Sequence, residues 1–198
     1  HDMLTGLPNR VLLAENVKST IDHCKKTNSE AALLLLDLDR FKVINDTRGH
    51  HSGDALLREI AERISKVIGP DDFAARIGGD EFAIIFSKFE SIDSINSRCA
   101  KILNSINEPY AISGVGQVIS ASIGVSLIPS DGDEYEEVLR MADLAMYDAK
   151  ANGRNCHRFF SEDCGCPNAR ICRPGSSDQM GASRSGKITS NPVHPGGR

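Results

Sequence analysis

The sequence predicts an α+β sandwich, in which helices cover a central, mainly antiparallel β-sheet. Segments with apolar residues at helical spacing alternate with short apolar segments of strand length. One of these, residues 31–36, is apolar throughout, as is typical of a strand buried on both faces. Residues 72–86 contain two such segments joined by a pair of glycines, which predicts a β-hairpin.

The remaining elements follow from spacing and from turn residues. The first helix has Pro8 near its first position, which suits the fixed backbone angle of proline. In the hairpin, Gly78-Gly79 is expected to supply the positive φ angles of a two-residue turn. Helices are predicted over residues 8–27, 52–68, 91–106 and 135–153. Strands are predicted over residues 31–39, both arms of 72–86, 118–128 and 156–160.

Composition restricts the class of protein. The 198 residues carry a formal net charge of −4, which indicates no general affinity for nucleic acid or for an anionic membrane. No apolar run approaches transmembrane length, and the N-terminus does not have the form of a signal peptide. Cys24, Cys99 and Cys156 are scattered singly, as expected for reduced thiols, so we expect a cytoplasmic domain; the full-length protein could still carry a membrane anchor.

The composition changes near residue 160. Residues 161–198 contain 16 Gly, Pro or Ser among 38 positions and few large apolar side chains. Such a segment buries too little surface to offset its ordering entropy, so we expect one domain over residues 1–160 and a disordered or non-native tail. Cys164, Cys166 and Cys172 lie in this tail without a fourth ligand at a usual zinc spacing.

Carboxylates gather at two strand ends. Asp37 and Asp39 end the central strand and would share a face if the strand persists, while Asp80 and Glu81 follow the glycine turn. A strand end is an ordinary place for a single acid. If the two strands are neighbours, however, the acids converge at one edge, and converging carboxylates resist joint ionisation. A Mg²⁺ ion would relieve this repulsion, in a two-metal phosphoryl transfer like that of polymerases.

The segment after the central strand carries candidate nucleotide-binding residues. Lys42 could place a positive charge on a phosphate. Asn45 and Asp54 flank a Gly-containing turn, and a carboxylate can accept both neighbouring N–H donors of guanine. Asp54 could equally be the N-cap of the helix that follows. The adjacent His50 and His51 are expected to be solvated in a polar turn rather than to bind metal.

Lys150 and Arg154 lie four residues apart at the C-terminus of the last predicted helix. Cations at this position interact favourably with the helix dipole, which by itself explains them. A triphosphate bound nearby would give them a second role.

Together, these clusters resemble the GGDEF family of diguanylate cyclases. Gly78-Gly79-Asp80-Glu81-Phe82 is the motif from which the family takes its name. The resemblance extends over residues 2 to about 160 and includes DMLTGLPNR, DLDRFKVINDTRGHHSGD, SIGVS and ADLAMYDAKANGRN. Five separate motifs at compatible spacings make a specific match.

The resemblance implies a fold like that of nucleotidyl cyclases and polymerase palms, which is ferredoxin-like, and a reaction that joins two GTP molecules into cyclic di-GMP. It implies two Mg²⁺ (or Mn²⁺) ions per site and a homodimer in which two domains face each other. By this resemblance, the catalytic and metal-binding positions are Asp37, Asp80 and Glu81, with the carbonyl of Leu38. The substrate-binding positions are Arg40, Phe41, Lys42, Asn45, Asp54, Gly78, Gly79, Lys150 and Arg154.

The sequence departs from the family at the inhibitory product site, an Arg-x-x-Asp pattern. Asp72 is present, but Gly69 stands in place of the arginine, so we expect no strong product inhibition. Relatives suggest an upstream sensory domain and, from GRNCHRFFS, a downstream EAL domain; we expect no nucleic-acid partner and no membrane contact by this domain. The alternative function is a GTP-binding regulatory module without catalysis.

Overall fold

A computed structural model describes residues 1–112 and 115–161. The predicted tail and its three cysteines therefore lie outside the described residues, except for Ser161. The helices are α1 (Arg10–Thr27), α2 (Phe41–Arg48), α3 (His50–Val67), α4 (Ile92–Asn107) and α5 (Tyr135–Ala151). The strands are β1 (Ala31–Leu38), β2 (Phe73–Gly78), β3 (Glu81–Phe86), β4 (Tyr110–Ile112), β5 (Val115–Gln117), β6 (Ala121–Ile128) and β7 (His157–Phe159).

The main sheet has the strand order β2-β3-β1-β6-β7, with β1 at its centre. β1 pairs antiparallel with both β3 and β6, and β2 pairs antiparallel with β3. Only the short edge strand β7 is parallel to its neighbour, β6. The predicted mainly antiparallel sheet is therefore confirmed. β4 and β5 form a separate two-stranded ribbon that the sequence did not predict.

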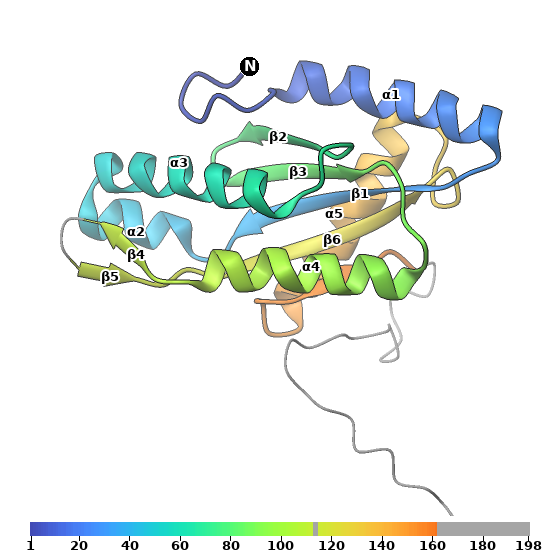
Figure 1. Ribbon diagram of the computed structural model, residues 1–198. Coiled ribbons are helices and arrows are strands. Elements are labelled where there is room, and N and C mark those ends of the chain that lie inside the picture. Colours follow the sequence, from blue (N-terminus) through green and yellow to red (C-terminus); the bar gives the residue numbers. More distant parts are fainter. Residues whose placement is uncertain (113–114, 162–198) are drawn as a thin grey trace, which may run out of the picture.

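The sheet lies between two layers of helices (Figure 1). Leu34 and Leu36 of β1 face a core formed with α2, α3 and α4. Leu33 and Leu35 alternate with them and face a second core formed with α1 and α5. Because the whole apolar run is buried on both faces, β1 holds a fixed position at the centre of the fold.

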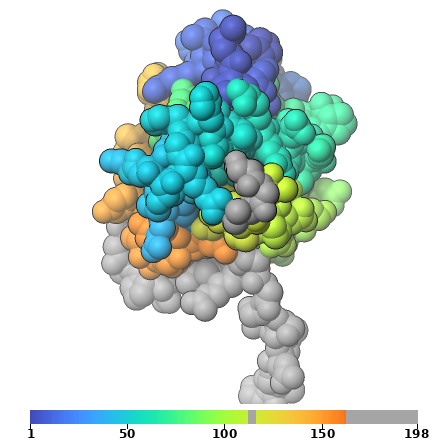
Figure 2. Space-filling view, turned by 90° about the vertical axis from the view of Figure 1, so that its left-hand side faces the viewer, coloured from blue at the N-terminus to red at the C-terminus, as the bar shows by residue number. Residues whose placement is uncertain are grey.

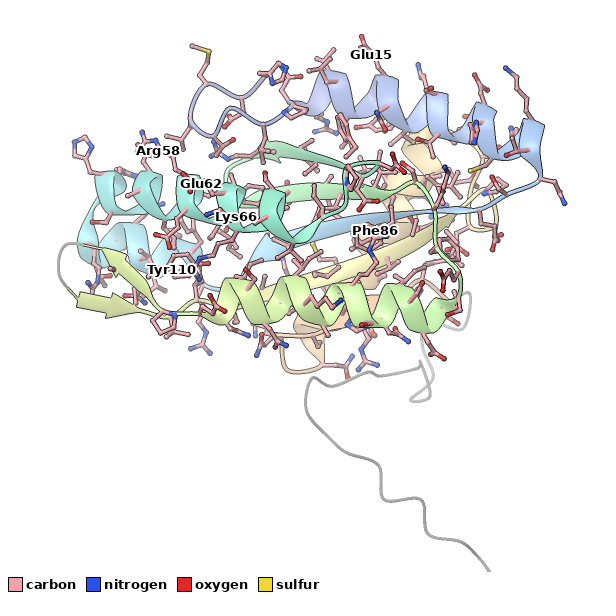
Figure 3. All side chains as sticks on the ribbon, viewed as in Figure 1. Glu15, Arg58, Glu62, Lys66, Phe86 and Tyr110 are labelled. Carbon is pink, nitrogen blue, oxygen red and sulfur yellow. The ribbon has the colours of Figure 1, made fainter. Side chains whose placement is uncertain are left out.

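The helices turn their polar residues outward. Arg58, Glu62 and Lys66 lie along the outer face of α3 (Figure 3), opposite the buried stripe that includes Leu56 and Ile60. On the other side of the sheet, α5 packs closely against β6. A Cβ added at Gly124 would lie 2.0 Å from a backbone oxygen of α5, so this contact requires glycine.

Two local predictions need correction. Residues 41–48 form a helix that the sequence did not predict. Its N-cap, Arg40, has a left-handed backbone (φ +59°) and makes no side-chain capping hydrogen bond. α3 then begins at His50, so His50 and His51 lie in its first turn rather than in a loop, although both are exposed as expected.

Candidate functional site

The β2–β3 hairpin presents its acidic residues at one end of the sheet. Gly78 pairs with Glu81, so the turn itself consists of Gly79, with φ +53°, and Asp80. The predicted turn, Gly78-Gly79, was one residue too early, because the register of the two strands shifts between Arg76 and Gly78. The guanidinium of Arg76 donates hydrogen bonds of 3.1 and 2.7 Å to the carbonyl of Gly79 and thereby holds the turn.

The predicted convergence of the two acidic segments is confirmed. Asp37 and Glu81 are direct cross-strand partners on neighbouring strands. The backbone N–H of Leu38 donates to the carbonyl of Asp80 at 3.3 Å, which places the turn beside the end of β1. One of these carboxylates has a basic partner within the chain, since Nζ of Lys150 lies 2.9 Å from Oδ2 of Asp37.

The charges in this cluster are not fully balanced. Burial raises the pKa of Asp37; the ion pair with Lys150 opposes that shift, while the charges of Asp80 and Asp39 add to it. Burial is also the largest cause of the raised pKa of Glu81, followed by the charges of Asp37 and Asp80. A single lysine therefore does not compensate this group of acids, and a further cation would be favoured here.

The donor set suits a hard divalent ion. Carboxylate and carbonyl oxygens are the ligands that Mg²⁺ prefers, and Mg²⁺ usually binds through one or two carboxylates together with substrate phosphates. Among the described residues, no three His, Cys, Asp or Glu side chains are arranged to hold an ion by themselves. An ion bound by these acids would need further oxygen ligands, which substrate phosphates could supply.

Asp39 does not join this cluster. β1 ends at Leu38, and the Asp39 side chain is buried among the hydroxyls of Ser120 and Ser122, at 2.6 and 2.7 Å. Asp37 and Asp39 were expected to share one face if the strand continued through Asp39. Because β1 ends at Leu38, this condition is not met.

The predicted guanine-binding residues lie on two successive helices joined at Gly49. Asn45 is in α2, and Asp54 is the fifth residue of α3. The N-cap of α3 is Gly49, so the alternative reading of Asp54 as an N-cap is wrong. The Oδ1 atom of Asn45 is buried and, within the described residues, has no hydrogen-bond partner.

Gly53 is a further candidate site residue, which the sequence did not predict. A Cβ at this position would lie 1.9 Å from Oδ1 of Asn45, so only glycine leaves room for that side chain. A glycine inside an otherwise helical pattern is unfavourable by about 1 kcal/mol relative to alanine, and this cost is the signal that could have identified it.

The phosphate-binding candidates surround the same end of the sheet. Figure 2 shows that end, with α2 and the start of α3 (cyan) near the segment after α5 (orange). Phe41 is buried at the start of α2, whereas Arg40 and Lys42 are exposed. Lys150 is in the last turn of α5, and Arg154 follows the helix, which ends at Ala151.

The acid of the inhibitory site is already paired within the domain. Asp72 forms an ion pair with Arg98 of α4 and accepts a hydrogen bond of 2.7 Å from the N–H of Gly69. The Arg98 guanidinium also lies 3.5 Å above the ring of Phe86, which is labelled in Figure 3. Because residue 69 is glycine, it contacts Asp72 through its backbone N–H and carries no guanidinium of the Arg-x-x-Asp pattern.

Fold and site together define a domain in which a glycine hairpin and a central strand bring carboxylates to one sheet edge, beside cationic side chains. A profile described as "Diguanylate cyclase, GGDEF domain" matches residues 1–156. The chain belongs to the GGDEF domain family, as its motifs predicted.

Relatives support this assignment. The chain is 44% identical over 160 residues to the bifunctional diguanylate cyclase/cyclic di-GMP phosphodiesterase MucR of Pseudomonas aeruginosa, covering 81% of this chain and 23% of the relative. It is 40% identical over 161 residues to the cyclic di-GMP phosphodiesterase NbdA of the same organism, covering 81% of this chain and 20% of the relative. The chain thus spans about a quarter or less of the length of these relatives.

Solved structures agree with the fold. A structure of TpbB from Pseudomonas aeruginosa that comprises only the GGDEF domain superposes with a TM-score of 0.80 at 35% identity, covering 83% of this chain and 96% of that one. The GGDEF domain of DgcB from Caulobacter crescentus, in complex with c-di-GMP, gives a TM-score of 0.71 at 31% identity, covering 80% and 93%. In the described part of this chain, none of the helices has the length and hydropathy of a transmembrane segment.

Proposed function

We propose that this domain is a diguanylate cyclase, which condenses two GTP molecules into cyclic di-GMP and releases two pyrophosphates. The observation that carries the proposal is the cross-strand pair of Asp37 and Glu81 beside the glycine turn, with Lys150 in an ion pair with Asp37. An excess of carboxylates at a sheet edge is unfavourable in the ligand-free domain but suits a metal–triphosphate complex.

In this proposal, two Mg²⁺ or Mn²⁺ ions per site, when bound, would supply charge neutralisation at the phosphates and activation of the attacking hydroxyl. Asp37, Asp80 and Glu81, with the Leu38 carbonyl, would hold these ions. Lys150 would then exchange its contact with Asp37 for one with the triphosphate. The 3′-hydroxyl of one GTP attacks the α-phosphate of the other, the bond to pyrophosphate breaks, and the same exchange repeats to close the ring.

The rest of the domain would position the nucleotide. Asp54 would accept the two neighbouring N–H groups of guanine, and Asn45, kept in place by the absence of a side chain at Gly53, would complete the recognition of the base. Lys42, Arg154 and the backbone at the start of α2 would bind phosphates. Because each domain would hold one GTP, turnover requires a second copy facing the first.

A second function is favoured by one specific observation. Some relatives with the same domain are named phosphodiesterases, including NbdA and, at 37% identity, PdeR of Escherichia coli. In such a protein the domain could bind GTP and regulate another domain without turnover. We propose a cytoplasmic location for either function, since the three described cysteines are buried thiols and GTP is the ligand.

Two other similar structures support a proposal about the partners of the full-length protein. One neighbouring structure is described as an EAL/GGDEF domain protein, at 40% identity, and another as SiaD in complex with its activator SiaC. We propose that this domain likewise works beside an EAL domain or an activating partner.

The test is incubation of the protein with GTP and Mg²⁺ at a concentration that favours dimers, or after fusion to a dimeric coiled coil. Formation of cyclic di-GMP supports the cyclase, and GTP binding without product supports the regulatory module. Asp37→Asn and Asp80→Asn should each abolish synthesis, whereas the control Asp133→Asn, which removes an exposed ion pair with Lys25, should not. Synthesis that survives either site variant would contradict the assignment of the acids.

A further inference from the structure

Asp39 is a buried carboxylate that belongs neither to the carboxylate cluster nor to the candidate guanine-binding residues. Its side chain is only 4% exposed. It accepts hydrogen bonds from Ser120 at 2.6 Å, from Ser122 at 2.7 Å and from the backbone N–H of Asn155 at 3.2 Å. A buried charge is tolerated only when it is well hydrogen-bonded, so this arrangement specifies one geometry.

These contacts join three segments that are distant in the sequence. Asp39 follows β1, and its own N–H donates to the carbonyl of Ser120 at 2.8 Å, ahead of β6. Asn155 belongs to the loop between α5 and β7. A single side chain therefore fixes that loop to the two central strands of the sheet.

The loop has a backbone that would not keep its shape unaided. Gly153, Arg154 and Asn155 are three consecutive residues with positive φ, at +107°, +59° and +49°. Non-glycine residues in this region cost on the order of 1–3 kcal/mol each and persist only where the surroundings enforce them. The hydrogen bond from Asn155 to Asp39 is one such restraint, and the Arg154 N–H donates to the carbonyl of Ala149 at 3.1 Å as another.

The same carboxylate also faces the Arg154 side chain. Nε of Arg154 lies 3.9 Å from Oδ1 of Asp39, while 48% of the arginine side chain remains exposed. The buried Asp39 carboxylate thus attracts the guanidinium of Arg154, while about half of the arginine side chain remains accessible to solvent. A guanidinium has donors on several edges, so it can keep this inner contact and bind a phosphate with the others.

We propose that Asp39 is a positioning residue for the terminal phosphates of the nucleotide, acting through Arg154 and the backbone of residues 153–155. This inference rests on the proposed function, because it takes a nucleoside triphosphate as the ligand. It assigns to the second acid of the DLD segment a role distinct from metal binding: the carboxylate does not contact the ligand but orients the group that does.

The experiment is a double-mutant cycle of Asp39→Asn and Arg154→Ala, read out as nucleotide binding in Mg²⁺ buffer. The probe is 3′-deoxy-GTP, which lacks the attacking hydroxyl and cannot be converted to product, and the comparison ligand is GMP, which lacks the β- and γ-phosphates. Asp39→Asn should raise the dissociation constant for 3′-deoxy-GTP about tenfold, the size of one lost charge-assisted contact. The constant for GMP should change less than about twofold, within the uncertainty of such comparisons.

If Asp39 acts through Arg154, the two substitutions will not be additive. In the Arg154→Ala background, Asp39→Asn should change the constant for 3′-deoxy-GTP by less than about twofold. Additive effects, or equal losses for 3′-deoxy-GTP and GMP, would overturn the proposal while leaving the cyclase intact. Failure of the wild-type protein to bind 3′-deoxy-GTP would overturn both.

A ligand-free measurement provides an independent test. Amide hydrogen exchange at Asn155 should be faster in Asp39→Asn than in the wild type, and unchanged exchange would contradict the proposal. If Asp39→Asn does not fold, Ser122→Ala can replace it, because it removes one hydrogen-bond partner of the carboxylate. Ser122→Ala should also raise the dissociation constant for 3′-deoxy-GTP more than that for GMP, but by a smaller factor. The matched control is Glu59→Gln, which removes the ion pair with Arg63 on α3 and should lower thermal stability without changing the affinity for either nucleotide.

Discussion

His157, on the edge strand β7, should make the stability of the domain depend on pH. The ring is 1% exposed, and its Nε2 atom lies 3.0 Å from Oδ1 of Asn96. Burial, with a smaller contribution from the charge of Arg158, lowers the pKa of His157 from 6.5 to about 4. The folded domain therefore keeps this histidine neutral over a range in which the unfolded chain takes up a proton.

The sign and size follow from proton linkage. Above pH 6.5 the histidine is neutral in both states and has no effect; as the pH falls from 6.5 to 4, only the unfolded state binds the proton, so stability is lost. With one pKa unit equal to 1.36 kcal/mol, the loss is about 2 kcal/mol at pH 5 and about 3 kcal/mol below pH 4.

The assay is urea unfolding at pH 8 and pH 5 of the wild type and of His157→Gln, which keeps a donor for Asn96 but cannot titrate. The carboxylates change the free energy of unfolding with pH by nearly the same amount in both proteins. The difference between the two proteins therefore reports the titration of His157. The free energy of unfolding of the wild type should fall about 2 kcal/mol further than that of the variant. Equal losses in the two proteins would refute the reasoning.

Three further outcomes are expected. Arg76→Ala removes the contacts to the partly buried carboxylate of Asp2 and to the carbonyl of Gly79, and should lower the free energy of unfolding by about 3 kcal/mol. The control Lys66→Ala removes an exposed ion pair and should lower it by less than about 0.5 kcal/mol. Equal losses in the two variants would contradict a stabilising role of Arg76. Glu81→Gln relieves repulsion and should raise stability without divalent ions by up to about 1 kcal/mol while abolishing synthesis, so an unchanged urea midpoint would count against the described electrostatics. Gly124→Ala places a Cβ against the backbone of α5 and should cost at least about 3 kcal/mol. Gly116→Ala, whose new Cβ would have no described atom within 4 Å, should cost little; similar unfolding midpoints for the two variants would be inconsistent with the packing.

The sequence predicted what depends on local pattern. The apolar run of β1 predicted a central strand, and the glycine pair predicted a hairpin. With the hairpin beside the central strand, Asp37 lies near Glu81, as the structure shows. The turn was misplaced by one residue, since the register shift at Arg76 leaves no trace in the residue types.

What the sequence did not predict depends on contacts between distant segments. The ion pair of Lys150 with Asp37 spans more than a hundred residues, and the partners of Asp39 come from the beginning of β6, from the residue before it and from the loop between α5 and β7. A single sequence carries no signal for such pairings. The short helix α2 was missed for a local reason, because the left-handed Arg40 that begins it is not a residue that usually marks a helix start.

The pairing of Asp72 with Arg98 limits what a substitution at position 69 could do. Gly69→Arg alone would not free the Asp72 carboxylate for a ligand. The new Cβ would lie 3.1 Å from Oδ2 of Asp72, and that carboxylate already has a guanidinium partner. An arginine at position 69 and an acid free to bind a ligand would therefore require a second substitution that releases Arg98. The effects of these two substitutions on ligand binding should not be additive, because both act on the same carboxylate.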